Sequence, residues 1–121
     1  MAPSLSAREK EEVIDLAKEL IKVPSYESSG GAIYRKVFKF LKENGIKDLE
    51  KGEPSPYQID GDERFNIIAK LGSGDGPKIM INCHLDTVDP SEGWYHPPYS
   101  ANEEDGRIFG LGASDMKGGC A

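Results

Sequence analysis

The sequence predicts an α/β fold: the N-terminal part of a mostly parallel mixed sheet flanked by helices. Two segments with apolar residues at helical spacing come first, and two nearly continuous apolar runs of strand length follow them. Such runs are typical of strands that are covered on both faces, as in α/β proteins. We therefore expect helices to cover a sheet.

Composition and charge exclude several classes of protein. The chain has 121 residues, with 15 Lys and Arg against 21 Asp and Glu, and a net charge of −6. This length suits one domain or part of one, and the acidic balance argues against nucleic acid and anionic membranes as partners. No stretch approaches the ~20 apolar residues of a membrane span, and the N-terminus has no signal core. With two cysteines, a cytoplasmic protein is expected.

The first helix is expected between Ser6 and Pro24. Ser6 and Glu9 have the spacing of a capping box, and an apolar stripe follows them. Pro24 ends the helix, because the residue before a proline disfavours helical angles. A second helix is expected from Ala32, and Asn44-Gly45 supplies the left-handed residue that commonly ends one.

Two strands are expected at residues 65–71 and 78–83, joined by a glycine-rich turn as an antiparallel hairpin. Their nearly continuous apolar character predicts burial on both faces. The polar residues 47–64 before them are expected to form a loop with a short strand near 57–59. A second hairpin is expected to turn at Asp105-Gly106, a favoured turn dipeptide.

His84 and Asp86 directly follow the second apolar run. In open α/β sheets, sites collect beyond the carboxyl ends of strands. A neutral imidazole is a common zinc ligand, and its other ring nitrogen usually donates to a carboxylate, which Asp86 is close enough to provide. An isolated H-x-D pair, however, is more often a histidine that makes one structural hydrogen bond.

Asp115 lies in a run of small residues, Gly110-Leu-Gly-Ala-Ser-Asp-Met-Lys-Gly-Gly119. Small neighbours allow close approach of the backbone, and one carboxylate can give an oxygen to each of two metal ions held roughly 3.5–4 Å apart. The spacing is equally compatible with a glycine-rich turn in which Asp115 caps a helix. Both interpretations stay open at this point.

Together, these two groups resemble the M20 family of metal-dependent aminoacylases and peptidases, of the acetylornithine deacetylase and succinyl-diaminopimelate desuccinylase type. The matching stretches are His84-Leu-Asp-Thr-Val88, Trp94, Pro97-Pro-Tyr-Ser100, Asp105-Gly106 and Gly110–Gly119. The chain has Leu111 where the family often has arginine. The resemblance spans nearly the whole chain and implies a zinc-peptidase-like catalytic domain, of which residues 1–121 are the N-terminal segment.

The resemblance also implies a reaction, namely hydrolysis of an amide bond of an N-acyl amino acid by metal-activated water. His84 and Asp115 would be metal ligands, with Asp115 bridging two zinc ions, and Asp86 would be a catalytic residue that orients and polarises His84. Cobalt and manganese are alternative metals. The expected partner is a small N-acyl amino acid or peptide, with neither nucleic acid nor membrane, and the full-length protein is expected to be a homodimer.

Other functions fit the same residues. A dipeptidase or carboxypeptidase of the family is one alternative, and an inactive fragment or interaction module is another. The family's general base and remaining ligands, like any dimerisation domain, are expected beyond the Asp115 motif, so the 121 residues alone are expected to be inactive. Glu103-Glu104 precedes Asp115 beside a turn and is expected at the solvated surface. His96 is expected at the surface or at a substrate rim, and Cys83 in the interior.

Overall fold

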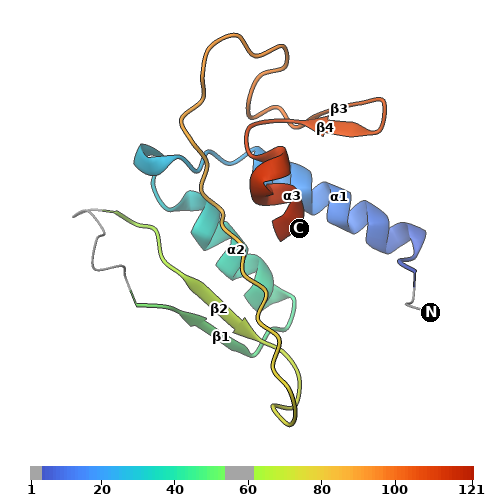
Figure 1. Ribbon diagram of the computed structural model, residues 1–121, viewed down its shortest axis with the longest axis vertical. Helices are drawn as coiled ribbons and strands as arrows, with labels where there is room; N and C mark the ends of the chain where they lie inside the picture. The colour runs from blue at the N-terminus through green and yellow to red at the C-terminus, as the bar shows by residue number, and fades with distance from the viewer. Residues whose placement is uncertain (1–3, 54–61) are drawn as a thin grey trace.

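The computed structural model describes residues 4–53 and 62–121 (Figure 1). The elements along the chain are α1 (Ala7–Ile21), α2 (Ala32–Glu43), β1 (Asp48–Lys51), β2 (Ile67–Lys70), β3 (Asn102–Glu104), β4 (Arg107–Phe109) and α3 (Gly118–Cys120). A 3₁₀ turn at Glu27–Ser29 precedes α2, and an irregular helical turn at Ala113–Lys117 precedes α3. The described residues thus combine helices with small antiparallel strand pairs. None of their helices is long and apolar enough to cross a membrane.

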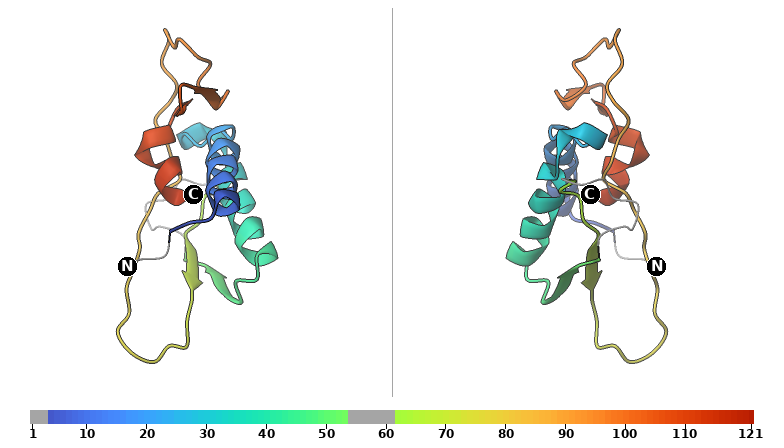
Figure 2. Two further views of the ribbon diagram at one scale, coloured as in Figure 1. Left: turned by 90° about the vertical axis from the view of Figure 1, so that its right-hand side faces the viewer. Right: turned by 90° about the vertical axis from the view of Figure 1, so that its left-hand side faces the viewer.

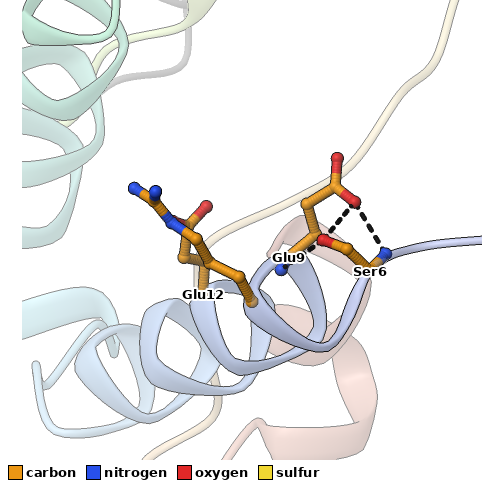
Figure 3. Close-up of polar contacts among 4 residues, drawn as sticks. Ser6, Glu9 and Glu12 are labelled. Carbon is orange, nitrogen blue, oxygen red and sulfur yellow. Dashed lines mark hydrogen bonds and ion pairs between the residues drawn. The ribbon is translucent and has the colours of Figure 1, made fainter.

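Helix α1 begins where the capping box predicts. The hydroxyl of Ser6 accepts a hydrogen bond from the backbone N–H of Glu9 at 3.2 Å, and the Glu9 carboxylate accepts one from the backbone N–H of Ser6 at 2.7 Å (Figure 3). The helix ends at Ile21, before Pro24. The second predicted helix is confirmed as α2, and Gly45 follows it with a φ of 83°.

Replacing Ser6 with alanine is expected to lower the free energy of unfolding by about 1 kcal/mol, because a backbone N–H of the first turn loses its acceptor. Hydrogen bonds from the Ser6 hydroxyl and backbone lower the pKa of Glu9 below 4.5. The stabilisation by the Glu9 carboxylate is therefore complete above pH 4.5 and is lost as the pH falls through the lowered pKa. Urea unfolding at neutral and acid pH measures both effects. Equal stability of the two proteins at neutral pH would contradict the capping role.

The core is formed by the C-terminal half of α1, the first turn of α2 and the residues on either side of the β3–β4 hairpin. Its buried apolar side chains are Ala17, Leu20, Ile21, Ile33, Ala101 and Leu111. Gly110 packs directly on α1, since a Cβ on Gly110 would lie 2.3 Å from Cγ2 of Ile21. The predicted stripe of α1 is buried toward its C-terminal end, whereas Val13 is exposed. Helix α1 therefore anchors the glycine-rich segment that carries Asp115.

The pairing of the first predicted strand differs from the prediction. Residues 67–70 form β2 as expected, but its antiparallel partner is β1, with Leu49 opposite Ala69. The loop expected at 47–64 therefore begins with a strand. The predicted hairpin with residues 78–83 is wrong, because β2 pairs with β1 instead. The short strand expected near 57–59 lies outside the described residues.

Residues 78–83 form an extended segment whose side chains are open to solvent, so the predicted burial on both faces is wrong. Ile79 is 89% exposed, Met80 88% and Ile81 89%; Cys83, expected in the interior, is also exposed. The side views of Figure 2 show this segment running clear of α2. An apolar strand is buried only where other elements cover it, and no strand in the described ranges pairs with this segment.

The second predicted hairpin is confirmed. Strands β3 and β4 pair with Glu103 opposite Ile108. Asp105, with a φ of 51°, and Gly106, with a φ of 72°, form the turn, and positive φ at both central residues is typical of a two-residue hairpin. An ion pair between Lys18 and Glu103 ties the hairpin to α1.

Candidate metal centre

The structure places the imidazole of His84 against the carboxylate of Asp115. Nε2 of His84 lies 2.8 Å from Oδ1 of Asp115, although 31 residues separate them in the sequence. His84 follows the extended segment 78–83, and Asp115 lies in the turn Ala113–Lys117. Both side chains are open to solvent, with exposed fractions of 46% and 87%. Two of the predicted site residues thus converge from separate loops onto an accessible face.

Asp86 lies at the opposite edge of the imidazole. Its backbone carbonyl oxygen is 3.1 Å from Nδ1 of His84, and its Oδ1 is 3.3 Å from the same nitrogen. We assign the Nδ1 proton to this contact, and the neutral imidazole then keeps a lone pair on Nε2. The sequence predicts that the Asp86 carboxylate orients His84. In the structure, the main-chain carbonyl of Asp86 contacts the same ring nitrogen as well.

The two contacts raise the pKa of His84 above 6.5, the Asp115 carboxylate contributing most and the Asp86 carbonyl next. Because both ring nitrogens face acceptors, these contacts stabilise the doubly protonated imidazolium relative to the neutral ring. The contribution of the charged His84 ring to the stability of the folded chain is complete below pH 6.5, and it is lost as the pH rises through the raised pKa.

In the metal-free chain, we expect the NMR titration midpoint of the His84 ring protons to lie above 6.5 and to fall toward that value in Asp115→Asn, which removes the largest cause of the shift. Asp86→Asn is the matched comparison. It should lower the midpoint less, because the backbone carbonyl of Asp86 stays in place. A midpoint that Asp115→Asn leaves unchanged would contradict the contact.

The turn around Asp115 directs its carboxylate toward His84, not toward the first turn of α3. The N-cap residue of α3 is Lys117, which makes no side-chain cap. Asp115 itself is non-helical, with φ −127° and ψ 93°, and the peptide bond between Asp115 and Met116 is cis. Of the two sequence interpretations, the helix cap is therefore not the geometry observed.

Tight packing at Gly112 brings the two loops together. Gly112 has a φ of 75°, and a Cβ at this position would lie 2.6 Å from Cγ2 of Thr87. The backbone N–H of Lys117 donates to the carbonyl of Gly112 at 2.9 Å. A second contact joins Cys120 to the His84 loop, since its thiol donates to the His84 carbonyl oxygen at 3.2 Å. The small residues noted in the sequence thus allow a close approach between loops.

Buried groups behind the two loops have shifted pKa values. Desolvation lowers the pKa of Lys117 to about 8. Burial, followed by the neighbouring Cys83 thiol, raises the pKa of the Cys120 thiol to about 11. Sequence reasoning missed Lys117, because a lysine in a polar, glycine-rich run is normally expected at the surface. Leu111, in the same glycine-rich run, is buried in the core.

The other acidic and histidine side chains considered in the sequence belong to the hairpin. Glu103 is ion-paired with α1, and Glu104 lies 3.1 Å from Nε2 of His96. The His96 ring packs between the rings of Tyr95 and Phe109, with centroids 4.7 and 4.8 Å away. Its side chain is 17% exposed, so His96 is partly buried against its aromatic neighbours, and a place at a substrate rim stays a prediction.

The pair of His84 and Asp115 fits part of a metal site. An imidazole nitrogen and a carboxylate oxygen are donors that zinc prefers, and here they face each other at an exposed position. Within residues 4–53 and 62–121, no group of three or more His, Cys, Asp or Glu is arranged to hold a metal ion. Because a catalytic zinc uses three protein ligands, the pair supplies two donors and further ligands are needed.

The stretch that carries these residues matches a known family. Residues 80–121 match the sequence model of the family described as Peptidase family M20/M25/M40. An acetylornithine deacetylase of Buchnera aphidicola is 35% identical over 108 residues, covering 87% of this chain and 28% of the relative. A probable succinyl-diaminopimelate desuccinylase of Staphylococcus epidermidis is 41% identical over 82 residues, covering 61% and 19%.

A succinyl-diaminopimelate desuccinylase of Acidiphilium cryptum is 50% identical over 59 residues, covering 49% of this chain and 16% of the relative. The chain therefore spans less than a third of the length of these relatives. His84, Asp86 and Asp115 all fall within the family match. These findings support the assignment of residues 80–121 to a fragment of an M20 family peptidase.

Proposed function

We propose that the protein is a metal-dependent hydrolase that cleaves an amide bond of an N-acyl amino acid. The observation that carries the proposal is the 2.8 Å contact between His84 and Asp115 inside the stretch that matches the M20 family. Relatives named as an acetylornithine deacetylase and a succinyl-diaminopimelate desuccinylase support an N-acyl amino acid as the class of substrate.

In this proposal, His84 and Asp115 would hold the metal, and Asp115 would be shared between two ions. Zinc suits an imidazole and a carboxylate best, and cobalt or manganese are alternatives. When bound, the metal lowers the pKa of a water molecule and polarises the scissile carbonyl. Asp86 acts through His84: by accepting the Nδ1 proton, it fixes the ring plane and presents the Nε2 lone pair toward Asp115.

The proposal extends to the complete fold. The exposed apolar segment 78–83 is then a strand of a mostly parallel mixed sheet that helices cover, and residues 1–121 are the N-terminal segment of the catalytic domain. A general base must accept the proton of the attacking water. Glu103 and Glu104 do not suit this role, because both are paired within or beside the hairpin. A homodimer in the cytoplasm stays a prediction.

The test is an assay of the complete protein on N-acetyl-amino acids, N-succinyl-amino acids and dipeptides. The protein is first stripped with a chelator, and zinc, cobalt or manganese is then added back. We expect hydrolysis of an N-acyl amino acid that chelation removes and metal restores. A preference for dipeptides would instead support the peptidase alternative. The absence of metal-dependent hydrolysis on all three classes would overturn the proposal.

A further inference from the structure

A three-residue segment after α1, Val23–Ser25, contacts both loops of the candidate metal centre. The carbonyl of Val23 accepts a hydrogen bond from Nζ of Lys117 at 2.8 Å. Two residues later, the carbonyl of Ser25 accepts one from the backbone N–H of Thr87 at 3.0 Å. Lys117 lies two residues after Asp115, and Thr87 three residues after His84. One short piece of backbone is therefore bonded to both loops.

The segment is well suited to hold a fixed geometry. Pro24, at its centre, has a restricted φ and no N–H of its own. Ser25 is 1% exposed, so its carbonyl is held in the interior. The two loops also meet at Gly112, where an added Cβ would contact Thr87 at 2.6 Å and Cδ of Lys117 at 3.5 Å. Val23–Ser25 and Gly112 thus contact the loops at separate points.

Lys117 is an unusual residue at this position, because its side chain is 0% exposed. Burial of an ammonium group is unfavourable unless it finds hydrogen-bond partners. The carbonyl of Val23 is such a partner, and it lies just beyond the C-terminal end of α1, where the helix dipole attracts a cation. A methionine would fill a similar space without the cost of burying a charge. The lysine is therefore better explained by its specific hydrogen bond than by its packing.

We propose that Lys117 is a positioning residue for the metal centre: its ammonium group, bound to Val23, holds the Asp115 loop at the distance from His84 at which both side chains can share one divalent cation. This inference rests on the proposed function, because the shared cation is part of it. Without the hydrogen bond, the Asp115 loop loses its attachment to Val23, whereas the His84 loop keeps its own through Thr87.

A zinc titration of the complete protein, followed through the assigned ring protons of His84 by NMR, measures this effect. The signal of His96, which packs in the hairpin region, is the internal reference. Lys117→Met removes the donor and keeps an apolar stem. Lys18→Met is the matched control, because it removes a lysine contact between α1 and the hairpin instead of one at the metal-bearing loops.

We expect Lys117→Met to raise the zinc concentration at half-saturation 10- to 100-fold, the usual range for loss of a group that orients a ligand. Lys18→Met should leave this concentration unchanged. The midpoint of thermal unfolding of Lys117→Met should change little, because removal of a buried charge offsets the loss of the hydrogen bond to Val23. A merely structural role would lower that midpoint and leave zinc affinity alone. Lys117→Gln, a shorter donor, is the second variant and should weaken zinc binding in the same way.

A readout without metal uses the two thiols that flank the loops. Cys83 precedes His84, and Cys120 lies 3.2 Å from the His84 carbonyl oxygen. Dibromobimane, a short reagent that joins two thiols, should link them faster in the wild type than in Lys117→Met. Because Lys117 also lowers the pKa of the Cys120 thiol, the linking rate is divided by the rate at which monobromobimane labels Cys120 in the same variant.

Three outcomes separate the inference from the proposed function. If the wild type binds zinc and Lys117→Met binds it as tightly, the inference is overturned and the proposed function stands. If the wild-type His84 signal does not respond to zinc, the proposed metal pair is overturned. In that case, crosslinking of Cys83 to Cys120 still tests the role of Lys117. Equal normalised linking rates in the wild type and Lys117→Met overturn the inference, and a slower normalised rate in Lys117→Met supports it.

Discussion

Replacing His84 or Asp115 with alanine is expected to abolish metal-dependent hydrolysis by the complete protein. Each substitution removes one of the two donors that face each other at 2.8 Å. A bound metal contributes several kcal/mol of transition-state stabilisation, so kcat/KM should fall on the order of 10³-fold. The measurement is kcat/KM for an N-acyl amino acid at a zinc concentration that saturates the wild type.

Two further variants make this result specific. Asp86→Asn keeps the backbone carbonyl that contacts Nδ1, so we expect a smaller loss, about 10- to 100-fold. Glu103→Ala removes an acidic side chain of the β3–β4 hairpin and should leave kcat/KM unchanged. Wild-type activity in both His84→Ala and Asp115→Ala would show that the roles assigned to these residues are wrong.

Gly112→Ala is expected to lower the free energy of unfolding more than Ser6→Ala, Lys117→Met or Gly74→Ala. Its φ of 75° is left-handed, which costs an alanine roughly 1–2 kcal/mol. The new Cβ would also meet Cγ2 of Thr87 at 2.6 Å, and forcing extra atoms into packed space costs about 1–3 kcal/mol. Together these effects should lower the free energy of unfolding by about 2–5 kcal/mol. Because Thr87 must move, zinc binding at His84 should weaken as well.

Gly74→Ala is the matched control for this substitution. Gly74 has a similar φ of 84°, but no atom lies within 4 Å of its added Cβ. It should therefore show only the conformational cost of roughly 1–2 kcal/mol and no change in zinc binding. Urea unfolding of both variants separates the two contributions. Equal losses in Gly74→Ala and Gly112→Ala would show that the contact between Gly112 and Thr87 has no energetic weight.

The features that the sequence predicted correctly depend on neighbours a few residues apart. Ser6 and Glu9 form a capping box within one turn of helix, and Asp105-Gly106 closes a two-residue hairpin. The pairing of strands that are far apart in the sequence could not be predicted from local patterns. The Asp48–Lys51 strand has one apolar residue in four, so its pattern gave no indication that it pairs with β2. The apolar run 78–83 predicts a strand that is buried on both faces, but burial requires other elements to cover the strand, and the run itself does not indicate which elements these are.

In the candidate site, too, the sequence identified the residues but not the contacts between them. Motifs identified His84, Asp86 and Asp115 individually, because residue type and local spacing are visible in a sequence. The contact between His84 and Asp115 depends on how two loops pack at Gly112, which is a property of the folded chain. Lys117 was missed because its burial depends on a carbonyl 94 residues away, and nothing local to a lysine indicates such a partner.

The central claim is that His84 and Asp115 act together on one cation. A double-mutant cycle of zinc affinity in the complete protein, measured by calorimetry, tests it most directly with the wild type, His84→Ala, Asp115→Ala and the double variant. If the two side chains share the ion, each single substitution removes most of the affinity and the double substitution removes little more, with a coupling of about 1–3 kcal/mol. Losses that simply add, or a single variant that binds zinc as tightly as the wild type, would contradict the claim.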